Sequence, residues 1–108
     1  MMRSEQIREI LSLYLKHNWK LRRVLITPKL KMQIADSLGN LFESAEILDS
    51  EIDAVWLSRA STDNRESWEI RRLSETGYAL VEVFEEDDEE EVREEIRQEM
   101  QARMQNNG

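Results

Sequence analysis

The sequence predicts an α+β fold in which a small antiparallel sheet of three to four strands packs with an N-terminal helix, a short helix and an acidic C-terminal helix. Apolar residues recur at helical spacing near both ends of the chain, and they alternate with polar residues in residues 19–26 and 52–84. A chain of 108 residues that is 40% hydrophobic has enough apolar material for one thin core and not for two. We therefore expect one small domain over residues 1–84, and an acidic helix over residues 85–108 that docks on it or binds a partner.

The first helix is predicted by a stripe of apolar residues on one face. The stripe consists of Ile7, Ile10, Leu11, Tyr14 and Leu15, which follow the spacing of successive helical turns. Ser4 is a suitable cap for the start of this helix, and Asn18 is a reasonable stop at its end.

A strand and a short helix follow the first helix. Residues 19–26 alternate, with Trp19, Leu21 and Leu25 on one face and Lys20, Arg22, Val24 and Ile26 on the other, while Arg23 falls among the apolar positions. Thr27 and Pro28 form a helix cap followed by proline at the first helical position. The helix is expected over residues 28–38, and Gly39 is expected to end it.

The middle of the chain predicts an antiparallel meander over residues 52–84, after an ambiguous connection with some extended structure at residues 40–50. Trp56 and Trp68 should lie on the same face of neighbouring strands, which favours a core pair over an exposed aromatic platform. The turn at residues 75–77 ends in a glycine that is available for positive φ. The last strand, residues 78–84, is apolar on both faces and is therefore expected to be central or covered.

The C-terminal segment is helical by propensity and very acidic at its start. Its apolar residues are spaced four apart: Val92, Ile96, Met100 and Met104. Such a narrow stripe lacks the alternating spacing of a coiled coil and predicts weak docking of a helix over about residues 87–105. We expect high salt to detach this helix more readily than it unfolds the sheet.

The charge of the chain is unevenly distributed. Residues 1–35 contain eight Lys and Arg and two Glu, which gives +6, whereas residues 36–84 and residues 85–108 each have a net charge of −7. The total of −8 argues against general binding of nucleic acids, which favour basic domains. The asymmetry indicates that two parts of the molecule, or of two molecules, attract each other.

The chain contains no cysteine, which excludes disulfides, thiolate nucleophiles and zinc sites built on sulfur. Charged residues interrupt the N-terminal stretch, so it does not read as a signal peptide, and no apolar run is long enough to span a bilayer. We therefore expect a soluble cytoplasmic protein without membrane association.

Catalytic motifs are weak in this sequence. His17 is the only histidine, and its place at the end of a helix favours an interaction with the helix dipole over catalysis. Asp49, Glu51 and Asp53 alternate as in some hard-metal sites, but a solvated strand edge is the better interpretation. Glycine-rich phosphate loops are absent. The expectation is a protein that is not an enzyme and has no cofactor and no tightly bound transition metal.

Two surfaces could serve recognition. One is the basic segment that follows Trp19, and the other is the apolar stripe of the C-terminal helix; together they comprise Lys20, Arg22, Lys29, Lys31, Val92, Ile96, Met100 and Met104. The leading hypothesis is a protein–protein interaction module or a homo-oligomer. The alternatives are an acidic inhibitor or immunity-type protein that binds a basic partner, and a ligand-binding or catalytic domain whose site forms on oligomerisation.

Overall fold

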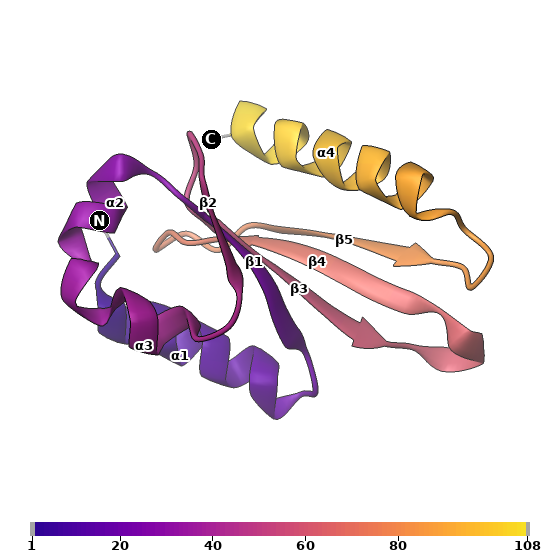
Figure 1. Ribbon diagram of the computed structural model, residues 1–108, viewed down its shortest axis with the longest axis horizontal. Helices are drawn as coiled ribbons and strands as arrows, with labels where there is room; N and C mark the ends of the chain where they lie inside the picture. Colours follow the sequence, from indigo (N-terminus) through magenta and orange to yellow (C-terminus); the bar gives the residue numbers. More distant parts are fainter. Residues whose placement is uncertain (1, 108) are drawn as a thin grey trace.

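A computed structural model describes residues 2–107 as a five-stranded mixed sheet with helices on both faces (Figure 1). The helices are α1 (Ser4–Lys16), α2 (Pro28–Gln33), α3 (Leu38–Phe42) and α4 (Glu90–Asn106), with 3-10 turns at Ala35–Ser37 and Thr62–Asn64. The strands are β1 (Lys20–Ile26), β2 (Glu46–Asp49), β3 (Ala54–Ala60), β4 (Glu66–Arg72) and β5 (Ala79–Phe84), in the sheet order β2-β1-β3-β4-β5. The α+β class is confirmed, and strands β3, β4 and β5 form the predicted antiparallel meander.

The prediction of three to four antiparallel strands agrees with the structure for β1, β3, β4 and β5, but it missed β2. This strand pairs in parallel with β1, where Val24 lies beside Ile47. A parallel neighbour needs a long crossover, and the helical segment from α2 to α3 supplies it. All four residues of β2 are exposed, so its sequence lacks the alternation that reveals a strand with one buried face.

The single helix expected over residues 28–38 is instead broken into α2 and α3. Its start is as predicted, because the Thr27 hydroxyl accepts a hydrogen bond from the Leu30 amide at 3.2 Å and Pro28 follows. Gly39 lies inside α3 and does not end a helix, whereas Glu43, with φ of 44°, follows the last residue of α3. The break allows apolar side chains of both short helices to reach one core: Leu30, Ile34, Leu41 and Phe42.

The sheet separates two apolar cores, so the expectation that the chain has apolar material for only one core was wrong. Helices α1 to α3 cover one face of the sheet. The sheet contributes Val24 and Ile26 of β1 and Val55 and Leu57 of β3 to the core on this face. Helix α4 covers the other face, where its Met100 and Met104 contact a set of strand residues that comprises Leu25, Ala54, Trp56, Trp68, Ile70 and Phe84. Trp56 and Trp68 are both buried with their ring centroids 6.1 Å apart, which confirms the predicted core pair.

A β-bulge in β1 changes which face its residues occupy. The pairing with β3 shifts register between Leu21 and Arg23, so Leu21 packs on the α1 side and Leu25 on the α4 side, although simple alternation placed them together. As a result both Arg22 and Arg23 reach the ring of Trp68 on the α4 side.

Three local predictions also differ from the structure. Ser4 is the first helical residue of α1 and not its cap; the amide of Arg3 donates to Gln6 Oε1 at 2.8 Å instead. Gly77 does not have positive φ. Strand β5 is at the edge of the sheet and not central, since β4 is its one neighbour in the sheet order of residues 2–107, and α4 covers one of its faces. No helix within residues 2–107 is both long enough and apolar enough to cross a membrane.

Candidate functional site

The basic residues predicted to form one surface are distributed over different parts of the fold. Lys20 lines a cavity on the α1 side of the sheet, whereas Arg22 lies over Trp68 on the α4 side. Lys29 and Lys31 are exposed on α2, and Lys31 Nζ lies 3.5 Å from Asp49 Oδ1 of β2. The structure therefore does not bring these four residues together.

The apolar stripe of α4 is mostly used inside the molecule. Met100 and Met104 are buried in the core between α4 and the sheet, and Ile96 packs at its margin. Val92 remains 45% exposed. Only the end of the stripe that carries Val92 and Ile96 is available to a partner.

A charged cluster attaches α4 to the sheet around Trp68. Arg97 is only 2% exposed, stacks 3.9 Å above the centroid of Trp68, and donates from Nη1 to Glu90 and Glu94 at 2.8 Å each. Arg23 of β1 also donates to Glu94 at 2.8 Å. Arg23 and Arg97 each have carboxylate partners, whereas Arg22 contacts only the ring of Trp68 among these groups. The paired residues form a structural ion-pair network that links α4 to the sheet.

The ionisation of the cluster follows from these contacts. Partial burial alone would raise the pKa of Glu94, but hydrogen bonds donated by Arg23, Gln98 and Arg97 lower it to about 2. The hydrogen bond from Arg97 lowers the pKa of Glu90 as well. Burial alone would lower the pKa of Arg97, but its bonds to the two carboxylates raise it, and the cluster is fully charged at neutral pH.

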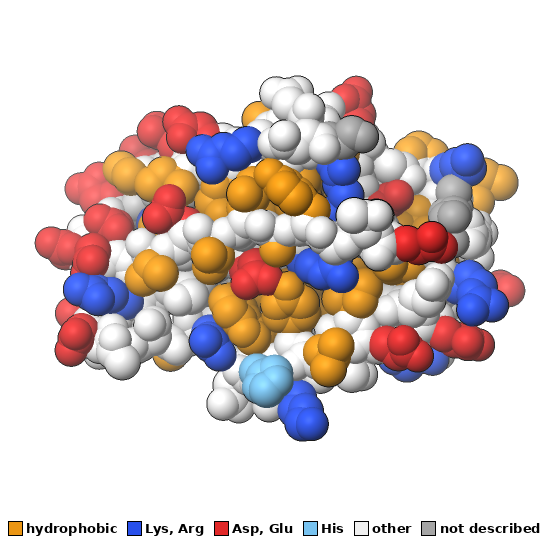
Figure 2. Space-filling view, turned by 180° about the vertical axis from the view of Figure 1, so that it is seen from behind, with side chains coloured by type: hydrophobic (Ala, Val, Ile, Leu, Met, Phe, Trp, Pro, Cys, Tyr) orange, Lys and Arg blue, Asp and Glu red, His pale blue; other side chains and the backbone are white. Residues whose placement is uncertain are grey.

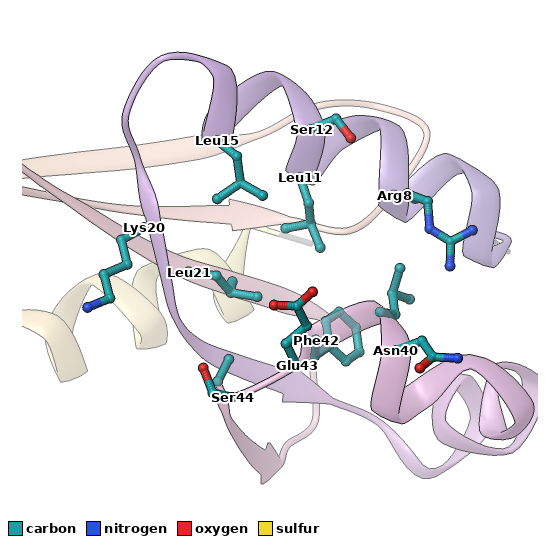
Figure 3. A pocket seen from close by; sticks show the side chains of 12 residues that line it. Arg8, Leu11, Ser12, Leu15, Lys20, Leu21, Asn40, Phe42, Glu43 and Ser44 are labelled. Atoms are coloured by element: carbon teal, nitrogen blue, oxygen red, sulfur yellow. The ribbon is translucent and has the colours of Figure 1, made fainter.

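A cavity of about 320 Å³ lies between α1 and residues 40–45 (Figure 3). Its walls include Leu11, Leu21 and Phe42, and the carboxylate of Glu43 points into it. Its size is at the lower limit of ligand pockets, which hold roughly 300–1,000 Å³. Its lining includes Ser12 and Ser44 and no histidine.

The residues considered for metal binding and catalysis are separated in the structure. Asp49 pairs with Lys31, the Glu51 carboxylate accepts from Gln105, and Asp53 Oδ1 accepts from the Thr27 amide at 2.7 Å. Within residues 2–107 no group of three or more potential ligands is placed to hold a metal ion. His17 is exposed at the end of α1, where its carbonyl accepts from Arg59 at 3.1 Å.

The free edge of β5 is the surface that these sequence predictions missed. The amide of Arg72 donates to the carbonyl of Tyr78, so the N–H and C=O groups of residue 78 point toward β4. Because these directions alternate along an antiparallel pair, Leu80, Glu82 and Phe84 also bond to β4. The N–H and C=O groups of Ala79, Val81 and Val83 consequently point outward from the edge of the sheet.

The side chains of the same three residues lie on an uncovered face. Val81 is 59% exposed and Val83 46% exposed, and Ala79 is exposed beside them, because α1 does not extend over this part of the sheet. In the view of the molecule from behind, apolar side chains are visible across the middle, and acidic side chains gather at the end where β5 leads into α4 (Figure 2). A partner strand would therefore meet backbone donors and apolar side chains together.

The other edge of the sheet is better protected against pairing. Strand β2 has four residues, and its Glu46 and Asp49 are paired with Arg23 and Lys31. A short strand with charged residues is a common defence against edge pairing, whereas β5 has six residues and one charged side chain, Glu82. No family model, curated protein or solved structure matches the chain, so no relative assigns a role to either edge.

Proposed function

We propose that this protein is a non-enzymatic protein–protein interaction module that takes up an extended strand of its partner along β5. The observation that carries this proposal is the combination of outward backbone groups and exposed apolar side chains at Ala79, Val81 and Val83. Strand addition uses backbone hydrogen bonds for affinity and alternate side chains for specificity. Both are present on this edge.

The acidic end of the molecule supports the alternative of an inhibitor that binds a basic partner (Figure 2). Several of its carboxylates are already used internally: Glu85 lies 3.0 Å from Arg65, and Glu90 is bound to Arg97. In contrast to these carboxylates, the outward backbone groups of β5 are directed away from β4 and can bond to a partner strand. The β5 edge is therefore the better supported binding surface. A basic partner would be recognised by binding that weakens steeply as salt rises.

The proposal is tested with a labelled peptide that has the sequence of residues 77–85, whose binding is followed by fluorescence anisotropy. We expect binding to the wild-type chain, and loss of at least tenfold in affinity for Val81→Lys, which places a charge on the edge. Met32→Lys is the matched control, because Met32 is 81% exposed on α2, far from β5 in the fold, and should bind normally.

A peptide that is N-methylated at the position of Val81 has the same side chains but lacks one amide donor, and it should bind more weakly than the unmodified peptide. Equal binding of both peptides, or equal binding by Val81→Lys and Met32→Lys, would contradict strand addition at β5. Circular dichroism and tryptophan fluorescence confirm that each variant is folded.

A further inference from the structure

The three residues of β5 whose backbone groups point outward have similar side chains. Ala79, Val81 and Val83 are small or β-branched apolar residues, symmetric about Val81, and all three direct their backbone groups outward. We infer that the strand taken up by β5 is β5 of a second copy, antiparallel, with Val81 opposite Val81 of the second copy. This inference rests on the proposed function and names its partner.

The hydrogen-bonding geometry selects this register. Outward groups must face outward groups, which restricts pairing to odd residues against odd residues. With Val81 at the centre, Ala79 lies opposite Val83 of the second copy, and Val83 lies opposite Ala79. Each of the three pairs can then exchange two hydrogen bonds, and the paired side chains form one apolar ladder on the uncovered face.

Like charges are kept apart in this register. Glu82 lies opposite Leu80 of the second copy, whereas a shift to Val81 opposite Val83 would place Glu82 directly opposite Glu82 of the second copy. Like charges that face each other across a strand pair are destabilising. The position of Glu82 therefore disfavours that alternative.

The acidic runs that follow β5 do not meet. Phe84, the last residue of β5, lies opposite residue 78 of the second copy, so the two Phe84 residues are six residues apart along the strand. At ~3.3 Å per residue this separation is roughly 20 Å, more than twice the Debye length of about 8 Å at physiological salt. The net charge of −8 on each chain therefore does not prevent the pairing.

One charge pair is favourable. In this register Glu85 of the second copy lies opposite Gly77. The guanidinium of Arg71 is next to Gly77, since its Nη2 lies 3.4 Å from the position that a Cβ atom would occupy on this glycine. Arg71 lies on the same sheet face as Ala79, with which it is paired, and its Nη1 donates to the carbonyl of Arg72. Glu85 lies 3.0 Å from Arg65 of its own chain, so in the dimer it would lie between that arginine and Arg71 of the other copy.

In this dimer, the side of α4 that lies next to β5 would also approach the second copy. Asn107 donates to the Tyr78 hydroxyl at 3.2 Å, so this side of α4 faces the β5 edge. Val92 and Ile96 lie on the same side of the helix, at spacings of about whole turns from Asn107. A two-fold axis perpendicular to the sheet sets this flank of α4 antiparallel to the same flank of the second copy, so the Val92 end of one helix faces the Asn107 end of the other.

Single cysteines test the register, because the chain has none of its own. Val81→Cys should form a disulfide-linked dimer on mild oxidation, since residues directly opposite in a hydrogen-bonded pair have Cα atoms ~5.5 Å apart, within the disulfide range of about 4.4–6.8 Å. Ala79→Cys and Val83→Cys are the matched controls. Alone, neither variant should form a disulfide-linked dimer, because the two cysteines would be roughly 13 Å apart. When the two variants are mixed, they should cross-link to each other.

The wild-type chain should show twice its mass of 12.9 kDa by sedimentation equilibrium as its concentration rises. Cross-linking of Ala79→Cys alone, or of Val83→Cys alone, would overturn the register and indicate a parallel or shifted pairing. A wild-type chain that stays monomeric at every concentration, together with absent Val81→Cys cross-linking, would overturn self-pairing. The peptide experiment remains separate: if the edge binds the peptide while the chain stays monomeric, the proposed function holds and this inference fails.

Discussion

Replacement of Arg97 by methionine separates the two ways in which α4 is held on the sheet. Arg97 is buried against Trp68 and bound to Glu90 and Glu94, so its aliphatic stem contributes packing and its guanidinium contributes charge. Methionine keeps a similar length and most of the apolar contact, whereas alanine removes both contributions.

The magnitudes predict that Arg97→Met is nearly neutral. The lost stabilisation is about 3–6 kcal/mol for the hydrogen bonds to the two carboxylates, at ~1.5–3 kcal/mol each, and up to about 2 kcal/mol for stacking on Trp68. The relieved costs are several kcal/mol for desolvation of the guanidinium and ~1–3 kcal/mol for its buried Nε, which has no hydrogen-bond partner. Glu90 is exposed and Glu94 keeps its bond to Arg23, so neither carboxylate is left buried and unpaired.

We therefore expect Arg97→Met to change the free energy of unfolding by less than about 1 kcal/mol, and Arg97→Ala to reduce it by about 2–5 kcal/mol through the space it leaves. Urea unfolding followed by circular dichroism measures both values. If Arg97→Met loses as much stability as Arg97→Ala, the ion pairs hold the helix and the packing argument is refuted.

Three further outcomes follow from the same contacts. Trp56→Ala should reduce the free energy of unfolding by ~3–5 kcal/mol, because the buried ring is central to the α4-side core; a change below 1 kcal/mol would contradict this placement. The pKa of Glu94 is lowered from 4.5 to about 2, so its contribution to stability is complete above pH 4.5 and is lost as the pH falls toward 2. In Glu94→Gln the free energy of unfolding should therefore decrease less steeply between pH 4.5 and pH 2 than in the wild-type chain. High salt should accelerate amide exchange at the start of α4 more than near buried Met100 and Met104, and equal acceleration along the helix would show that charge alone holds it.

The parts of the fold that could be predicted from the sequence are those with one buried face. Helix α1 and strand β3 place apolar residues at regular spacing, and the Trp56–Trp68 pair follows from the alternation across a polar turn. Strand β2 could not be found in this way, because it is stabilised by parallel backbone pairing with β1 and has no buried face of its own. The bulge at Arg22 was equally hidden, since one extra residue reverses the faces without changing the composition.

The candidate site was missed because β5 is apolar on both faces. Leu80 and Phe84 face α4, but Val81 and Val83 face solvent, and a sequence pattern does not distinguish an apolar face that is covered from one that is available. The order of elements contained a usable signal: β5 is the last strand of a meander and is followed only by a helix, which is typical of a sheet edge. In α4, a residue that the apolar stripe omitted, Arg97, proved to be as buried as its methionines.

Amide hydrogen exchange along β5 tests the central claim most directly. At a concentration low enough for the chain to be monomeric, the amides of Ala79, Val81 and Val83 should exchange quickly, because they point outward, while those of Leu80 and Glu82 should be protected by their bonds to β4. Addition of the peptide of residues 77–85 should slow exchange at the three outward amides and leave the β2 edge unchanged. Protection that appears at β2 or elsewhere, with Ala79, Val81 and Val83 still exchanging freely, would contradict strand addition at β5.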